Sequence, residues 1–492
     1  MAERIVGSSF FGKLLEICIP LLTWIIITLP IWLSPFHPAV VAYFIICFDL
    51  YFLYKAATFT YLATISYRKV ALVKKNSYDK KLLGMRSADE LRHFIIIPNY
   101  SEPLHKLDAT LSAIVKTDYP FKNIYLVLAF EERETDAQKK AQALEKKYRP
   151  FFQDIVVTYH PLLSHEAQGK ASNQTYSAKI VDEYVIRNNL KRENVIITIC
   201  DADSQLPKNY FSYLSYTYLK DSDRLYHFYW APVLLYNNFW KLPFFVRMQA
   251  TLSSIIRLAF ASLKEDLIQI STYSVSLSLL KKINFWDVDV IPEDWHVFYQ
   301  AFFTFGERIK TIPLFTIVNS DAVYSGGLIK TSTNRYDQER RWAWGVSDIG
   351  YTLKRFFRTP HIRVIPKLKR ILFLIEAHLF WPTSFFILTI SASIPPLVNP
   401  VFKRTVLGFL LPQLSGLILT TASVLLILYV YLDFKLRQNV NVKTKPLAVP
   451  FLFIQWYFLP WVSFLFSSLP ALEAHTRILL GKKIRYKVTE KV

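Results

Sequence analysis

Two long apolar stretches lie one after the other near the start of the chain, at Leu14–Leu33 and Ala39–Tyr61. Each is close to the ~20 residues that an α-helix needs to cross the hydrocarbon core of a bilayer. The first is too long for the apolar core of a signal peptide, and the second follows it at once. Composition agrees, because 52% of the 492 residues are hydrophobic and 38 Phe stand against 12 Gly. We therefore expect a retained hairpin of two transmembrane helices.

The charges on either side of this hairpin differ. The connector Ser34–Pro38 has no Lys or Arg, whereas the second stretch is followed by Arg68, Lys69, Lys74, Lys75, Lys80 and Lys81. Because Lys and Arg are enriched in short cytosolic segments, we expect the part that follows to lie in the cytosol. The net charge of +21 gathers beside apolar stretches, with no helix-turn-helix or stacking-platform pattern, so we expect no nucleic-acid partner. The three cysteines suggest neither a disulfide framework nor a zinc site.

Three further apolar segments occur near the C-terminus, at Ile371–Ile394, Val406–Leu432 and Leu447–Leu469. Three spans would leave the tail outside, yet the tail is basic, which favours the cytosolic side. We therefore expect the last segment, which Pro450 and Pro460 interrupt, to be re-entrant or broken.

Between these membrane regions the pattern changes to short runs rich in β-branched residues, separated by helical stretches such as Lys170–Leu190. The runs are His93–Ile97, Ile124–Ala129, Ile155–Tyr159 and Val195–Cys200. Alternating strands and helices predict a largely parallel sheet, with ligands beyond the carboxyl ends of its strands. Asn99, Glu131 and Asp201 fall at such ends.

Four regions follow from this reading. They are a transmembrane hairpin at 1–66, a cytosolic α/β domain at 67–360, a second transmembrane region at 361–480 and a basic tail at 481–492. Within the α/β domain, Asn237–Leu263 is aromatic and basic, and it suits a helix in the membrane interface or a core helix. Asp348–Phe357 is a second interfacial candidate.

Asp201-Ala202-Asp203 presents two carboxylates directly after an apolar strand. Hard oxygen ligands of this kind suit Mg²⁺ or Mn²⁺. If the reaction releases a diphosphate, a metal on Asp203 would neutralise its developing charge. A triplet of this kind is also common in surface turns, so it is weak on its own.

Pro292-Glu293-Asp294-Trp295 is a second acidic site. A hydroxyl nucleophile needs a base that takes its proton, and Asp294 is our candidate. The alternative is a helix N-terminal turn, where the helix dipole favours acidic residues.

Gln338-Glu339-Arg340-Arg341-Trp342 adds guanidinium groups for phosphate oxygens and an indole face on which a sugar can stack. An Arg-Trp pair near a membrane is also a common interfacial anchor. A strand-end Asn, D-A-D, E-D-W and Q-E-R-R-W follow one another, each in a separate element. This succession favours a catalytic site over a set of unrelated turns and anchors.

From about His93 onward the chain resembles the membrane-bound family 2 glycosyltransferases, which include the cellulose, chitin and hyaluronan synthases. Ile95–Pro103 is similar to the family's opening strand and P-x-Y-N-E turn, with Ser101 in place of the asparagine. Gly169–Asn173 resembles its G-K-A-x-x-N segment. The D-x-D, T-E-D and Q-x-x-R-W motifs follow in the family's order.

The resemblance implies a GT-A (Rossmann-like) cytosolic glycosyltransferase domain within a multi-pass α-helical membrane protein, using Mg²⁺ or Mn²⁺ and a nucleotide sugar, with UDP-sugars favoured. It assigns the metal to Asp201 and Asp203, and catalysis to Asp294 with Glu293. The expected donor-binding residues are Pro98, Asn99, Glu102, Glu131, Lys170, Asp201 and Arg341. The expected acceptor-binding residues are Gln338, Trp342 and Trp295.

The sequence departs from the family in three places. Its second strand ends in Glu131-Glu132 rather than an aspartate pair, so Glu131 stands in for the uridine-side carboxylate. Pro292 replaces the threonine of T-E-D, and Ser271–Ser276 replaces a small Gly-rich segment near the acceptor.

Tyr486–Lys491 is similar to the F-x-V-T-x-K gating loop, although a solvated basic tail explains it as well.

We therefore predict a hexosyltransferase that transfers sugar by inversion to a growing polysaccharide at the membrane, with coupled translocation left open. The alternative is addition of sugar to a membrane lipid. A non-catalytic scaffold or a transporter is a further alternative. A transporter's spans should carry several buried polar residues, yet only Asp49 is central in these segments.

Overall fold

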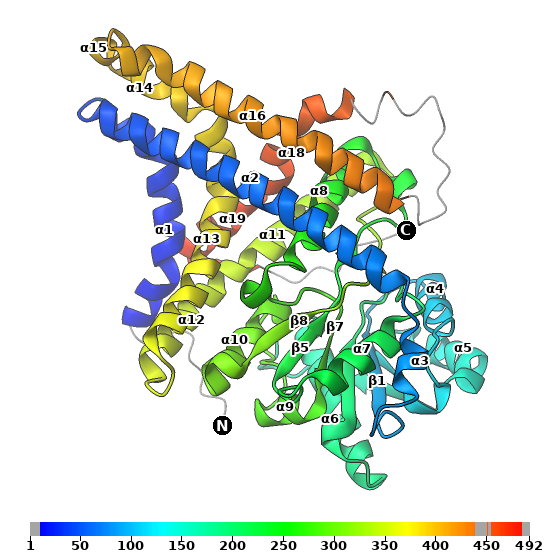
Figure 1. Cartoon of the computed structure of the whole chain (residues 1–492). Coiled ribbons are helices and arrows are strands. Elements are labelled where there is room, and N and C mark those ends of the chain that lie inside the picture. The colour runs from blue at the N-terminus through cyan, green and yellow to red at the C-terminus, as the bar shows by residue number, and fades with distance from the viewer. Residues whose placement is uncertain (1–9, 438–449, 451–453, 485–492) are drawn as a thin grey trace.

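The computed structural model describes the chain except residues 1–9, 438–449, 451–453 and 485–492. The expected gating segment, Tyr486–Lys491, lies outside the described residues. An α/β part built on a twisted sheet stands beside a group of long helices (Figure 1).

A seven-stranded sheet with the order β3-β2-β1-β4-β7-β5-β8 forms the centre of the α/β part. Its strands are β1 (Arg92–Pro98), β2 (Ile124–Glu131), β3 (Asp154–His160), β4 (Val195–Ile199), β5 (His227–Trp230), β7 (Tyr273–Ser276) and β8 (Lys310–Pro313). β1 to β4 pair in parallel, while β7 is antiparallel to both neighbours. The four expected strands are confirmed. A separate pair, β6 (Val233–Leu234) with β9 (Val318–Asn319), lies outside this sheet.

Helices cover both faces of the sheet, so its central strands are buried on both sides, whereas the edge strands β3 and β8 are only partly buried. They are α3 (Tyr78–Leu82), α4 (Leu104–Ile114), α5 (Ala137–Tyr148), α6 (Lys170–Arg187), α7 (Tyr210–Lys220), α9 (Leu277–Lys282) and α10 (Glu293–Phe305). In β1, Phe94 and Ile96 belong to one buried cluster, and Ile95 and Ile97 belong to the other. This alternation explains why the strand is one continuous apolar run. The expected α/β domain is confirmed.

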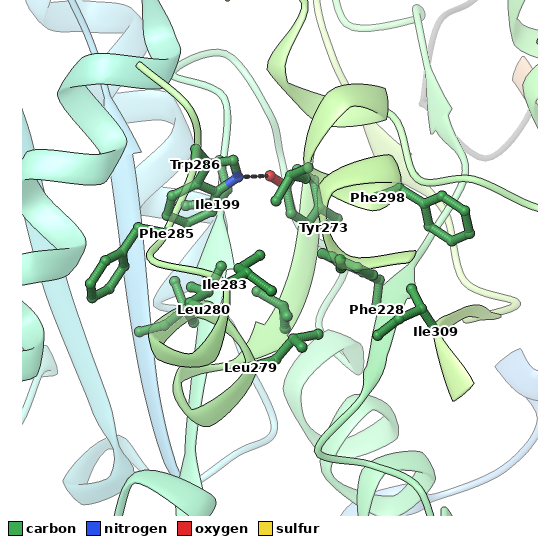
Figure 2. Packing of buried hydrophobic residues seen from close by; sticks show 14 of the residues in the cluster. Ile199, Phe228, Tyr273, Leu279, Leu280, Ile283, Phe285, Trp286, Phe298 and Ile309 are labelled. Carbon is green, nitrogen blue, oxygen red and sulfur yellow. Dashed lines mark hydrogen bonds between the residues drawn. The ribbon is translucent and has the colours of Figure 1, made fainter. Parts of the chain in front are cut away.

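The cluster beneath the cleft described below is rich in aromatic rings (Figure 2). Trp286 Nε1 donates a hydrogen bond of 2.6 Å to the Tyr273 hydroxyl, with both side chains buried. A buried indole N–H needs such a partner, so this bond fixes the loop before α10 to strand β7.

Replacing Tyr273 by Phe should lower the stability of the folded protein by about 1–3 kcal/mol, because Trp286 Nε1 is then buried without a partner. Thermal unfolding of the detergent-solubilised protein measures this. Tyr226→Phe is the control, because its hydroxyl accepts from Lys282 at an exposed position and its loss should have little effect. Equal melting temperatures for the two variants would contradict the expectation.

Four helices are long and apolar enough to cross a membrane within the described part of the chain. They are α1 (Phe10–Leu33), α2 (Pro38–Lys74), α13 (Val364–Thr389) and α16 (Val406–Arg437). The short helices α14 (Ile394–Val398) and α15 (Pro400–Lys403) form the turn from α13 to α16. This turn lies beside the α1–α2 turn, where Asn399 Nδ2 donates to the Pro35 carbonyl (Figure 1).

The third expected C-terminal segment is not one continuous helix. Its described part contains α18 (Leu459–Ser463) and a π-helical turn at Phe464–Ser468, and α19 (Leu469–Leu479) begins at the last residue of the segment. Phe466 has non-helical backbone angles there, and its carbonyl accepts from Gln249 Nε2. Among the described residues, the C-terminal region thus has two long apolar helices rather than three, and the broken alternative agrees with the structure.

Three helices connect the sheet to the long helices. α8 (Phe244–Phe260) packs on both α2 and α16, while its other face meets β6. α12 (Ser347–Arg358) packs on α1, and Lys354 pairs with Glu16 at 2.6 Å. α11 (Leu328–Ala343) packs on α19, which in turn packs on α1.

Candidate active site

One cleft opens at the carboxyl ends of β1, β2 and β4, and it brings together all but one of the residues that the sequence nominated. Its lining includes Pro98, Asn99, Glu102, Glu131, Lys170, Asp201, Asp203, Glu293, Asp294, Gln338, Arg341 and Trp342. The exception is Trp295, whose ring packs against Phe373 and His378 of α13. Residues from six separate parts of the chain thus meet beyond the carboxyl ends of the strands, where the sequence predicted a ligand.

Lys170, the first residue of α6, is the central cation of this cleft. Its Nζ lies 2.6 Å from Asp201 Oδ1 and 3.2 Å from Glu293 Oε1, and it donates to the Ser271 carbonyl. Burial alone would lower the pKa of Lys170, but the two carboxylates raise it well above its ordinary value. Lys170 therefore stays protonated and offsets the acidic residues around it.

Asp294 lies in the first turn of α10, and both of its carboxylate oxygens are oriented by backbone donors. Oδ2 accepts from the Ser271 N–H and Oδ1 from the Trp295 N–H, each at 3.0 Å. Burial raises the pKa of Asp294, although these bonds and Lys170 oppose the shift. Burial also raises the pKa of the neighbouring Glu293. A carboxylate with a raised pKa is a better proton acceptor, as a general base requires.

The segment Ser271-Thr272 organises three of these groups. Ser271 has φ = +62°, a left-handed conformation that side chains rarely adopt. This conformation turns its N–H to Asp294 and its carbonyl to Lys170. Thr272 Oγ1 accepts from the Asp201 N–H at 3.2 Å. The sequence identified this segment only as a replacement for glycines, and the structure shows that serine takes up the backbone geometry that glycine favours.

Asp203 is held by the strand-end segment after β9. Its Oδ2 accepts from Ser320 Oγ at 2.7 Å and from the Asp321 N–H at 2.9 Å, and Asp321 pairs with Lys106. The described residues contain no group of three or more His, Cys, Asp or Glu that could hold a metal. Mg²⁺ commonly takes one or two carboxylates, with phosphate oxygens and water completing the shell. Asp201 and Asp203 fit that pattern of donors.

Trp342 also lines the cleft and lies near two guanidinium groups. Arg257 and Arg335 lie 5.6 and 5.2 Å from its ring centroid, within the range of cation–π attraction. Arg335 also donates to Gln338 Oε1 at 2.6 Å. Burial, and then Arg335, lower the pKa of Arg257 to about 10, while Asp201 and other carboxylates oppose the shift.

One side of the cleft is formed by the ends of β1 and β2 and by α6. Asn99 Nδ2 and Asn173 Nδ2 both donate to the Ala129 carbonyl, at 3.2 and 2.9 Å. Glu131 is buried and pairs with Arg133. The buried Oδ1 atoms of Asn99 and Asn173 have no hydrogen-bond partner among the described residues. Buried polar atoms of this kind are candidates for contacts with a ligand.

Sequence reasoning missed Arg257, Asp321 and Ser320. Asp321 follows a strand in the same way as Asp201, but that strand has two residues and gives no recognisable pattern. Arg257 lies in α8, within the segment that the sequence assigned either to a helix in the membrane interface or to a core helix. It reaches the cleft only through tertiary packing.

No protein-family model matches this sequence, and no curated protein matches it. Solved structures similar to the chain are glycosyltransferases. A mannosyltransferase from Pyrobaculum calidifontis, in complex with GDP-Man and Mn²⁺, is 14% identical, with a TM-score of 0.42 over 87% of this chain and 100% of its own. S. aureus TarS 1–349 with UDP-GlcNAc is 12% identical, with a TM-score of 0.35 over 72% and 94%. GalNAc-T7 with UDP, GalNAc and Mn²⁺ is 11% identical, with a TM-score of 0.35 over 59% and 58%.

Proposed function

We propose that this chain is an integral-membrane, inverting family 2 glycosyltransferase of GT-A type, which transfers a hexose from a nucleotide sugar. The observation that carries the proposal is the meeting of Lys170, Asp201, Asp203, Asp294 and Trp342 in one cleft. These residues supply a general base, a paired-carboxylate metal site, a cation for phosphate and an aromatic platform for sugar. The α/β domain would lie in the cytosol and the four long helices in the bilayer.

In this mechanism the acceptor hydroxyl gives its proton to Asp294 as its oxygen attacks C1 of the donor sugar. The bond between C1 and the diphosphate oxygen breaks, and its electron pair leaves with the diphosphate. Attack opposite the leaving group inverts the configuration at C1. Ser271 and Trp295 N–H groups hold the carboxylate in position for this transfer.

The leaving diphosphate needs positive charge, and the cleft provides it. Lys170 and Arg341 both line it, and each can bind phosphate oxygens. Mg²⁺ or Mn²⁺ held by Asp203 and Asp201 would supply further positive charge at the leaving group. Asn99 and Glu131 would hold the nucleoside.

The acceptor that we propose is a growing polysaccharide, stacked on Trp342 beside Gln338. A second candidate is a membrane lipid, because an apolar pocket lies between α1, α2 and α13. It is lined by Ile26, Phe44, Phe48, Tyr51, Glu376, Leu379, Phe380 and Thr383. Mass analysis of the product separates the two, since a lipid carrying a single sugar would exclude polymer synthesis.

The base role predicts the pH dependence of turnover. Asp294 acts as a base only when it is ionised, and burial raises its pKa. We therefore expect kcat/KM to rise with pH and to reach half of its maximum at a pH above ~3.9, the ordinary pKa of an aspartate. Nucleoside diphosphate release measured from about pH 4 to about pH 8 tests this. A rate that falls throughout as pH increases would contradict the assignment.

Release of free nucleoside diphosphate by the purified protein with Mn²⁺ tests the proposed function, using a panel of UDP- and GDP-sugars. Turnover with one donor would establish the transferase and identify its sugar. The assay is run with and without an added oligosaccharide, because a transferase that lacks its acceptor would also show no turnover. No turnover by well-folded protein under either condition would favour the scaffold alternative.

A further inference from the structure

A buried carboxylate near the end of a long apolar helix connects that helix to the α/β part. Asp433 of α16 accepts a hydrogen bond of 2.9 Å from the Tyr236 hydroxyl and one of 3.1 Å from Thr251 Oγ1. Arg437 pairs with its other oxygen at 2.8 Å. A carboxylate is stable in such surroundings only when it is paired and hydrogen-bonded. The position of Tyr236 is therefore tied to α16.

Tyr236 begins a short segment that supports the backbone of Asp203. Asn237, its neighbour, donates through Nδ2 to the Asp203 carbonyl at 3.2 Å. The Asn237 backbone N–H also donates to the Ser320 carbonyl. A displacement of this segment would therefore move the backbone of Asp203 and the backbone of Ser320, whose hydroxyl donates to the Asp203 carboxylate.

The same segment also fixes the residues that orient the Asp203 side chain. Asn238 exchanges two hydrogen bonds with the Ala322 backbone, of 2.7 and 2.9 Å. Ser320 and Asp321, which directly precede Ala322, are the groups that donate to Asp203 Oδ2. All of these residues except Asn237 are nine-tenths or more buried. A continuous buried path therefore leads from α16 to the carboxylate that would hold the metal.

We propose that Tyr236 and Asp433 are positioning residues for the divalent metal at Asp203, so that packing of α16 against the α/β part sets the affinity for that metal. The inference rests on the proposed function, because it takes Asp203 as a metal ligand. Groups that orient a metal ligand typically change metal affinity by about 10- to 100-fold when they are removed. Tyr236 acts through one further layer, and we expect an effect at the lower end, of about 10-fold.

The competing explanation is that Asp433 only fastens α16 to α8, through Thr251. Thr251 donates to the same carboxylate oxygen as Tyr236, but no hydrogen bond in the path to Asp203 passes through it. Tyr236→Phe and Thr251→Val therefore form a matched pair. Each removes one hydroxyl from Asp433, and only the first cuts the path to the metal site.

The experiment titrates the full-length detergent-solubilised variants with Mn²⁺ alone and follows free Mn²⁺ by its electron paramagnetic resonance signal, without turnover. We expect Tyr236→Phe to raise the Kd for Mn²⁺ by about 10-fold and Thr251→Val to leave it unchanged. Melting temperatures are recorded beside each titration. An unchanged Kd in Tyr236→Phe, with a melting temperature lowered as in Thr251→Val, would overturn the positioning role.

Two further variants complete the design. Asn237→Ala cuts the same path one step nearer to Asp203 and keeps the inference testable if Tyr236→Phe does not fold. Its Kd should rise as well, and an unchanged Kd would count against the path. Asp203→Asn separates the two levels of the argument. If it binds Mn²⁺ like the wild type, the proposed metal site fails, whereas if it loses Mn²⁺ while Tyr236→Phe and Asn237→Ala keep it, only the positioning role fails.

Discussion

Asp294→Asn should lower kcat for sugar transfer by about 10²- to 10⁴-fold, the range over which a positioned general base contributes. The amide keeps the size of the side chain, but its single oxygen can accept from only one of the Ser271 and Trp295 N–H groups, and it cannot take the acceptor's proton. Folding should be retained, because the substitution removes a buried charge without leaving a cavity. Nucleoside diphosphate release with the donor that the panel identifies measures the loss.

Asp287→Asn provides the matched control. Asp287 lies seven residues upstream, is partly exposed, and hydrogen-bonds His296 outside the cleft. Its amide variant should keep turnover near that of the wild type. If Asp294→Asn also stays active while Glu293→Gln does not, the base is the adjacent Glu293, and our assignment within the pair is wrong.

Lys170→Met should destabilise the protein by about 3–5 kcal/mol, the usual effect of removing one partner from a buried ion pair. Methionine keeps the length of the side chain, but Asp201 and Glu293 are then left beside each other without their cation. The deficit should shrink at acid pH, where both carboxyls become protonated and need no counter-charge. Turnover should fall as well, because the diphosphate loses a cation.

Lys281→Met is the control for this experiment. Lys281 pairs with Asp182 at 3.0 Å, but its side chain is about half exposed, so its loss should cost no more than about 1 kcal/mol. Thermal and denaturant unfolding of both variants at neutral and acid pH compare the two sites. Similar stabilities for the two variants would show that the Lys170 cluster is solvated and does not depend on its cation.

The sequence predicted the first four strands and the cleft because those signals are local. Each strand is a run of at least five residues, and Asn99, Glu131 and Asp201 lie at or within two residues of the ends of three of them. β5, β7 and β8 have four residues each, and β5 and β7 are buried at every position, so they show no alternation that sequence could reveal. The last apolar segment is broken, as one of the two alternatives expected, but its π-helical turn lies at Phe464–Ser468 rather than at either proline.

Other features of the site depend on tertiary contacts. Arg257 and Asp321 reach the cleft from helices and loops that are far from its motifs in sequence, and no periodicity marks them. Trp295 has the expected position in the chain, but its ring turns toward α13 because Phe373 and His378 offer an aromatic surface there. The left-handed backbone of Ser271 was equally hidden, since serine gives no signal for φ > 0. The role of Tyr486–Lys491 stays a prediction.

The two helix turns that meet at Pro35 and Asn399 bear on how the protein is made. If the four long helices cross the membrane as two hairpins, as we propose, the residues between Lys74 and Val364 begin and end on the side opposite these turns. During synthesis, the insertion machinery would then have to carry the two short loops that contain Pro35 and Asn399 through the lipid. The whole α/β domain could fold where the ribosome releases it.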